Sequence, residues 1–321
     1  MTARPIPHRP APAGPRDPLV FATTADGSPA GFAITGERSH LILAGAAGSG
    51  LTAACRVISL EAARRNMAVR VCCSREHDAR QLRNWPNITA AGSPEDTIAL
   101  VGATFGDMMT RCAEIETGLQ PADHQPALLV IDEYSAWARM AAAHWGQTWF
   151  GGGQGVCPAF GQLAALLVLG QAARISVAVA ISASASRPPR FPPGVLDSVG
   201  TFTALGRLDE ETAWALFGGR AADTDVPHGV NGAATIFTPA GRGQAATVHW
   251  LPAPAGPLSD RETRLLRDML PDSSRAITGA TGREFPGVHP ASGGAGRITR
   301  RPRKESARGP GARFPEECEQ W

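Results

Sequence analysis

The sequence predicts an α/β protein with a mainly parallel, doubly wound sheet. Apolar strands alternate with helical stretches along the middle of the chain, which is typical of the βαβ units that build parallel sheets. The segment Ala127–Ile131 is a continuous apolar run, as expected of a strand that is covered on both faces. A short apolar strand at 40–44 leads directly into a glycine-rich loop, and helical spacing follows at 52–65. We therefore expect one open sheet with helices on both sides.

The elements before this buried strand have local signals. Alternating apolar residues at 19–35 flank Asp26-Gly27, a pair suited to a tight turn with positive φ, and they predict an N-terminal β-hairpin. The run at 68–73 is typical of a second buried strand. Ser93-Pro94-Glu95-Asp96 combines an N-cap, proline at the first helical position and acids in the first turn. The helix that begins there repeats apolar residues at helical spacing until Gly118.

The alternation continues after Ile131. A glycine-rich loop at 150–155 precedes a predicted helix at about 159–171, and a strand is predicted at 175–181. Further strands are predicted at 201–205, 234–238 and 246–250. Beyond Pro252 only residues 259–270 have helical spacing.

Composition and charge indicate one domain with a tail at each end. The chain has 321 residues, of which 43% are hydrophobic, and this suits a globular core. Prolines crowd the first eighteen residues, and glycine, proline and arginine crowd the end. We expect a disordered N-terminus at 1–17, one domain at 18–255, and a short helix followed by a disordered basic tail at 256–321. The net charge of +2 does not indicate a general electrostatic attraction to nucleic acid.

Cysteine usage and hydropathy favour a reduced cytoplasm. The six cysteines include no C-x-x-C pair, and their spacing fits neither a metal site nor a secreted disulfide framework. Cys72 and Cys73 are best explained as small buried residues on a strand. The first ten residues lack the apolar region of a signal peptide, and the apolar run at 163–169 is too short to cross a bilayer. We therefore expect a cytoplasmic protein without a membrane segment.

The stretch Gly45-Ala46-Ala47-Gly48-Ser49-Gly50-Leu51-Thr52 matches a phosphate-binding loop at every defining position but one. Its glycines let backbone N–H groups surround phosphate oxygens, and the helix that follows directs its positive dipole end at them. We assign these residues and Ala53 to ATP binding, with Thr52 holding Mg²⁺ through its hydroxyl. Leu51 stands where the pattern requires lysine, so the charge that would reach the γ-phosphate is missing. The alternative is a tight strand-to-helix turn without a ligand.

An arginine would have to replace the missing lysine. The single lysine of the chain, Lys304, lies in the C-terminal tail. Arg56, on the helix after the loop, and Arg75, at the end of the second strand, are the candidates. A solvated surface position is the simpler interpretation of each.

Asp132 and Glu133 follow Ala127–Ile131 and form a candidate Walker B element. Open α/β sheets bind ligands at the carboxyl ends of their strands, so this pair and the glycine loop should meet across one crevice. Asp132 would hold Mg²⁺ directly or through water, and Glu133 would act as the catalytic residue by polarising the attacking water. An Asp-Glu pair after a strand is ordinary surface chemistry when it occurs alone, whereas the glycine loop upstream favours descent from a nucleotide site.

Two further features have a functional and a structural interpretation. Trp137, Trp145, Trp149 and Phe150 could stack on single-stranded bases, but their spacing is more typical of a core or a subunit interface. The tail carries six arginines and Lys304 between 297 and 313, which is more typical of a solvated segment than of a DNA contact.

The order of these motifs resembles the FtsK/SpoIIIE family of DNA-translocating ATPases, in particular the short versions carried by plasmids and integrative conjugative elements. The matching blocks span about residues 18–255 and are, in order, SHLILAGAAGSGLTAA, LRNWPNI, MTRCAEIETG, ALLVIDEYSAW, GQAARISVAVA, ALGRLDEETAWALFGG and DVPHGV. Several motifs in one order are more specific than any single one. The resemblance implies a RecA-like P-loop NTPase fold that uses ATP and Mg²⁺. It also implies double-stranded DNA as a partner, and a homo-hexamer or a hetero-ring with a related ATPase.

Three nucleotide-facing elements depart from this family. Leu51 replaces the lysine, Cys73-Ser74-Arg75 stands where many relatives have Asp-Pro-Lys, and residues 181–186 replace the polar Thr-Gln that precedes Arg-Pro. An N-terminal membrane segment and a C-terminal winged-helix DNA reader are also not evident. Arg174 and Arg207 lie in matching blocks and are candidates to reach a neighbouring subunit's nucleotide.

Three hypotheses for function follow. The leading one is an FtsK/SpoIIIE-like protein of a mobile element that acts in plasmid or conjugative DNA transfer, binds nucleotide and has weak or no ATPase activity. The second is an active double-stranded DNA translocase in which an arginine replaces the lysine. The third is a pseudo-ATPase subunit that regulates or caps an active ring.

Overall fold

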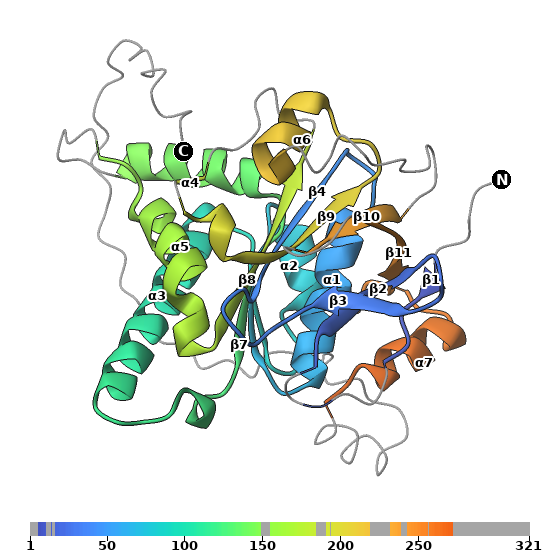
Figure 1. Cartoon of the computed structure of the whole chain (residues 1–321), viewed down its shortest axis with the longest axis horizontal. Coiled ribbons are helices and arrows are strands. Elements are labelled where there is room, and N and C mark those ends of the chain that lie inside the picture. Colours follow the sequence, from blue (N-terminus) through green and yellow to red (C-terminus); the bar gives the residue numbers. More distant parts are fainter. Residues whose placement is uncertain are drawn as a thin grey trace, which may run out of the picture.

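Eleven strands form one sheet in the described part of the chain, and helices pack on both of its faces (Figure 1). The computed structural model describes residues 6–10, 14, 17–148, 155–183, 191–192, 194–218, 232–238, 243–255 and 257–271. Trp149, Phe150, residues 184–186, the DVPHGV block and the basic tail lie outside these residues.

The strands follow one another across the sheet in the order β3-β2-β11-β10-β9-β4-β8-β7-β5-β6, and β1 pairs with β11. Their bounds are β1 Ile6–Pro7, β2 Leu19–Thr24, β3 Pro29–Phe32, β4 His40–Gly45, β5 Ala68–Cys72, β6 Ile88–Ala91, β7 Ala127–Ile131, β8 Ile175–Ser182, β9 Val199–Leu205, β10 Ala233–Phe237 and β11 Gln244–Trp250. The predicted N-terminal hairpin is confirmed, since β2 and β3 pair antiparallel around Gly27, whose φ is 87°.

The sheet has a parallel half and an antiparallel half. All neighbours from β9 through β4, β8, β7 and β5 to β6 pair in parallel, as expected for a doubly wound sheet. β10, β11, β2 and β3 are antiparallel to their neighbours along the sheet, and of these pairings only the β2–β3 hairpin was expected. Only residues 238–243 separate β10 from β11, and so short a connection can join only antiparallel strands.

Two sets of helices enclose two apolar cores. α1, α2 and α7 pack on one face of the sheet, and α3, α4, α5 and α6 pack on the other. Their bounds are α1 Leu51–Arg64, α2 Glu76–Leu82, α3 Pro94–Glu116, α4 Tyr134–Thr148, α5 Pro158–Leu169, α6 Glu210–Phe217 and α7 Asp260–Asp268, with short 3₁₀ turns at Pro121–Asp123, Gly170–Ala173 and Leu196–Ser198. The predicted start of α3 is confirmed, because the Ser93 side chain accepts a hydrogen bond from the Asp96 N–H.

The two ends of the described chain belong to the same packed unit. Ile6 and Pro7, which fall in the segment expected to be disordered, instead pair with His249 and Trp250 of β11. Leu266, Met269 and Leu270 of the α7 region are buried in the first apolar core, although the sequence placed α7 beyond the domain boundary at 255. The proposed division of the chain therefore stays a prediction, and residues on both sides of it pack together.

Candidate nucleotide site

The glycine loop connects β4 to α1 at the carboxyl edge of the parallel strands. A Cβ at Gly45 would lie 2.5 Å from the Ser49 Oγ and 2.8 Å from the Leu205 carbonyl oxygen, so only glycine fits. Gly48 and Gly50 have φ values of 79° and 107°, a region that residues with a Cβ rarely adopt. The glycines that define the motif are therefore required by the backbone path of the loop.

The loop is open to an anion. Ala46, Ala47 and Gly48 are exposed, and the turn is closed by a hydrogen bond of 3.0 Å from the Ser49 N–H to the Ala46 carbonyl. No side chain caps the N-terminus of α1 at Gly50, and its first turn carries no acid. The first amides of a helix have no partner within the helix, so those of α1 are available to bind an anion. The Ser49 hydroxyl is buried and has no hydrogen-bond partner among the described residues.

Leu51 fills the lysine position with hydrocarbon. Its side chain is half-buried and packs against the apolar core between α1 and the sheet. Leucine is therefore part of the packing of α1 rather than a group that projects toward the loop. Ala53 is also half-buried in this first turn.

Thr52 and Asp132 lie beside each other at the carboxyl edge of the parallel strands. The Thr52 Oγ1 donates a hydrogen bond of 3.3 Å to the Asp132 Oδ1, and the Asp132 N–H donates to the Cys72 carbonyl at 2.9 Å. β4 and β7 are separated by β8, yet the ends of these strands place both side chains together. This hydrogen bond confirms the prediction that Asp132 and the residues of the glycine loop lie close together.

Asp132 is a buried carboxylate with a raised pKa. Burial, and after it the negative charge of Asp78, raises the pKa of Asp132 to about 6, with a smaller contribution from Glu133. The Thr52 hydrogen bond and the charge of Arg56 act in the opposite direction. A divalent cation would stabilise its charged form. Mg²⁺ is held in proteins by one or two carboxylates together with phosphates and water, and Thr52 with Asp132 fits that description. No cluster of three or more His, Cys, Asp or Glu side chains suited to a metal occurs among the described residues.

Glu133 adopts a strained backbone conformation. Its φ is 68°, in the left-handed region, and its carbonyl accepts the hydrogen bond from the Trp137 N–H that begins α4. The side chain is half-exposed, so water can reach it. Strain of this kind in a residue other than glycine is frequent at functional sites.

The candidate arginines differ in what they reach. Arg56 donates hydrogen bonds of 3.2 Å to the Leu251 carbonyl and to the Gln81 Oε1, and its charge lowers the pKa of Asp132. Arg75 is exposed before α2, and Arg207 is exposed beyond the end of β9. Arg174 precedes β8, at the opposite edge of the sheet from the loop, and its side chain binds two carbonyls of the turn at 122–124.

Sequence reasoning missed Asp78 and Leu205. Asp78 lies on α2, a helix that was not expected, and its charge is the largest influence after burial on the pKa of Asp132. Leu205 ends β9 and contacts the positions of Gly45 and Gly50. The acids in the sequence Glu76-His77-Asp78 after a buried strand were the available signal for α2.

The aromatic and cysteine residues have structural roles. Trp137 is fully buried and packs edge-on against Phe160, and Trp145 is partly buried beside the same core. Trp137 therefore cannot stack on a base. Cys72 and Cys73 are buried as predicted, and burial raises the pKa of Cys73 to about 12.

None of the described helices combines the length and the apolar character needed to cross a bilayer. This agrees with the short apolar run at 163–169.

Comparisons with solved structures identify the fold. No known family profile matches the sequence, and no curated protein matches it. EssC ATPases 2 and 3 from Geobacillus thermodenitrificans superpose with a TM-score of 0.57 at 15% identity, covering 88% of this chain and 53% of that one. The pCW3 conjugation coupling protein TcpA, solved with ATPγS, has a TM-score of 0.55 at 14% identity, with 73% and 66% covered. The cytoplasmic domain of Thermomonospora curvata EccC has a TM-score of 0.52 at 15% identity, with 81% and 32% covered.

EssC and EccC are ATPases and TcpA was solved with an ATP analogue, so the likeness confirms the expected RecA-like P-loop NTPase fold. At such low identity the likeness concerns the fold. The chain spans less than two thirds of each neighbour's length.

Proposed function

We propose that this chain is a nucleotide-binding protein that acts in the transfer of DNA by a mobile element, with weak or absent ATPase activity. The observation that carries the proposal is the site itself. An exposed glycine loop and a Thr52–Asp132 pair lie at one edge of the sheet, while Leu51 is half-buried against the core where a lysine would be needed.

ATP would bind with its phosphates on the amides of the loop and at the N-terminus of α1. Mg²⁺, when bound, would supply positive charge between the phosphates and Asp132. Thr52 would hold the ion through its hydroxyl, and Asp132 would hold it directly or through water. Glu133 would orient the attacking water from its position at the start of α4.

Slow turnover follows from the missing cation. Charges aimed at the transferred phosphoryl group stabilise its transition state, and the loss of one such group typically costs a factor of about 10² to 10³ in rate. Arg56 donates to a carbonyl and to an amide oxygen away from the loop, so it does not take the place of the lysine in this conformation. Binding of nucleotide, by contrast, depends mainly on backbone amides and on Mg²⁺.

The neighbours support the setting in which we place this activity. TcpA is a conjugation coupling protein that was solved with an ATP analogue, and EccC is a type VII secretion ATPase. By analogy, double-stranded DNA is the proposed partner, a homo-hexamer or a hetero-ring is the proposed assembly, and the cytoplasm is the proposed location. The assignments of residues 45–53, Asp132 and Glu133 are part of the same proposal.

Calorimetric titration with ATPγS tests the nucleotide site. We expect binding that requires Mg²⁺ and weakens in Thr52→Val, whereas the absence of binding at millimolar ligand and Mg²⁺ would refute the proposal. ATP turnover is then measured with and without duplex DNA. We expect turnover near the background rate in both cases.

An active translocase is the second candidate, and one observation favours it. The charge of Arg56 already acts on Asp132, so a shift of this side chain toward the loop would bring a cation to the phosphates. Steady hydrolysis that is stimulated by duplex DNA and lost in both Arg56→Gln and Glu133→Gln would establish this candidate over the first. Gln preserves most of the side-chain volume at both positions.

A further inference from the structure

A pocket lies between the segment that follows the N-terminal strand and α7. Its volume is about 580 Å³, and it shares no residue with the glycine loop. Pro7 and Arg9 line one wall, and Arg261, Arg264, Leu265 and Asp268 line the other. Residues some 250 positions apart in the sequence therefore enclose one space, which is within the size range of pockets for small ligands.

The pocket carries an excess of positive charge. Three arginines line it, against one carboxylate, that of Asp268. Arg9, Arg261 and Arg264 are exposed, and none of them makes a hydrogen bond or an ion pair with another described residue. Three guanidinium groups around one pocket outnumber its single carboxylate, and this excess of positive charge attracts an anion.

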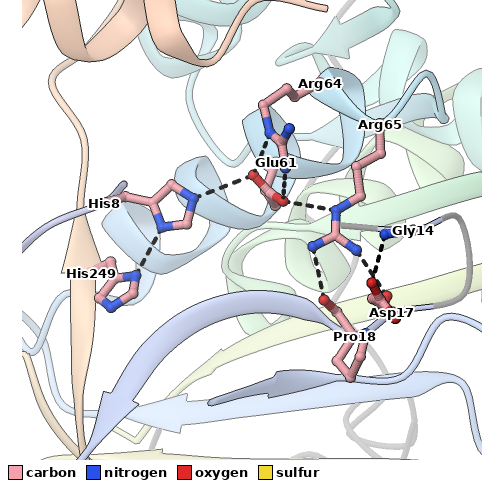
Figure 2. A network of polar contacts seen from close by, with 8 residues as sticks. All are labelled: His8, Gly14, Asp17, Pro18, Glu61, Arg64, Arg65 and His249. Carbon is pink, nitrogen blue, oxygen red and sulfur yellow. Dashed lines mark hydrogen bonds and ion pairs between the residues drawn. The ribbon is translucent and has the colours of Figure 1, made fainter. Parts of the chain in front are cut away.

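Buried polar contacts fix the N-terminal wall (Figure 2). His8, between the lining residues Pro7 and Arg9, is buried, and its Nδ1 lies 2.8 Å from the His249 Nδ1. Its Nε2 lies 3.3 Å from the Glu61 Oε2 on α1, and its backbone N–H donates to the Trp250 carbonyl at 2.9 Å. Glu61 in turn accepts from Arg64 and Arg65. Arg9 is thus presented from a segment that is held by both backbone and side chains.

The opposite wall is fixed equally well. Leu266 and Met269 anchor α7 in the apolar core, and Ser259 and Glu262 form a capping box at its start. Arg261 and Arg264 are three positions apart and so lie on one side of the helix. Both walls fix the backbone that carries these arginines before any ligand arrives, so binding has only the side chains to order.

We propose that this pocket binds a phosphate-bearing ligand through Arg9, Arg261 and Arg264. A carboxylate has two oxygens and one charge, which a single arginine fork satisfies. A phosphate group presents several acceptor oxygens around one centre and suits guanidinium groups that approach from two walls. The phosphate can come from a free polyphosphate or from a nucleic-acid backbone. The inference goes beyond the proposed function and does not depend on it, because the two sites have no residue in common.

The test compares arginine variants of one helix inside and outside the pocket. Arg261→Gln/Arg264→Gln removes two charges from the pocket. The single variant Arg264→Gln and the control Arg267→Gln each remove one charge, and Arg267 is exposed on α7 and does not line the pocket. Arg9→Gln tests the other wall without any change to the helix. The probes are inorganic pyrophosphate by calorimetry, and a short fluorescent DNA duplex and a glutamate-rich peptide by anisotropy.

We expect the double variant to weaken binding of a phosphate probe by tenfold or more, Arg9→Gln to weaken it in the same direction, and Arg267→Gln to leave it unchanged. If the double variant loses one pyrophosphate site in calorimetry and keeps any site at the glycine loop, the ligand is a free polyphosphate. Loss confined to the duplex would identify a nucleic-acid backbone. Equal effects of all variants, binding of neither phosphate probe, or a selective loss of peptide binding alone would each overturn the proposal.

Discussion

The variant Leu51→Lys tests whether the lysine is the only group that the nucleotide site lacks. Leu51 is half-buried against the first core, so its replacement removes part of the roughly 1.5 to 3 kcal/mol that full burial of such a side chain provides. The lysine stem can cover some of the same surface, and we expect a loss of about 1 kcal/mol in the free energy of unfolding. A hydrogen bond from a charged group contributes about 1.5 to 3 kcal/mol, which corresponds to roughly 10- to 100-fold tighter binding of ATPγS.

The measurement is calorimetric titration with Mg²⁺ and ATPγS, followed by ATP turnover. Leu51→Met is the control, because it keeps hydrocarbon at this position and adds no charge. We expect Leu51→Lys to bind the analogue at least tenfold more tightly than Leu51→Met and to hydrolyse ATP faster. If the two variants bind equally, the loop does not hold phosphate in the way that we describe.

Four further predictions concern strain, packing and pH. Glu133→Gly should be more stable than Glu133→Ala by about 1 kcal/mol in urea unfolding, because glycine adopts a φ of 68° without the strain that alanine has there. Greater stability of the alanine variant would show that the backbone at this residue is not strained. Gly45→Ala should lose about 1 to 3 kcal/mol, since the added Cβ would lie 2.5 Å from the Ser49 Oγ, whereas Gly106→Ala, in open space on α3, should gain about 0.5 to 1 kcal/mol. Mg²⁺-dependent binding of ATPγS should weaken as the pH falls below about 6, because Asp132 then takes up a proton; affinity that is constant down to pH 5 would argue against its role. Burial, and after it the charge of His8, lowers the pKa of His249 to about 4. The unfolded chain therefore takes up a proton at His249 before the folded protein does, and the free energy of unfolding should fall by up to about 3 kcal/mol between pH 6.5 and pH 4. In His249→Asn the free energy of unfolding in urea should depend less on pH in this window, and an unchanged pH dependence would refute the assignment.

The sequence predicts the parallel half of the fold well because its signals are local. Ala127–Ile131 is apolar throughout and forms β7, which is buried on both faces. The loop after β4 has glycines at positions where the backbone requires them. The N-cap at Ser93 is likewise contained in four consecutive residues.

The missed elements depend on contacts that are distant in sequence. β1 has two residues and exists only through pairing with β11, some 240 positions away. α2, β6 and α6 are short, so their periodicity covers too few turns or residues to be distinctive. α4 was not expected either, and its Trp137 is buried in the core.

The sequence predicted the residues of the candidate site that belong to local motifs. It did not predict the residues that other helices bring to the site. Gly45, Thr52 and Asp132 were found from motif positions, and their geometry matches the expectation. On α2, Asp78 acts on Asp132 through its charge, and Gln81 accepts a hydrogen bond from Arg56. The pocket lined by Arg9 and Arg264 brings together the two ends of the described chain, and no local pattern announces it.

The helix that follows the glycine loop is also tied to the antiparallel half of the sheet. In its second turn Arg56 binds the Leu251 carbonyl just beyond β11, and in its last turn Glu61 contacts His8 beside β1. A ligand that displaced α1 would therefore also displace the segment that carries Arg9. If binding at one site changed the affinity of the other, linkage would make the reverse effect equal in size.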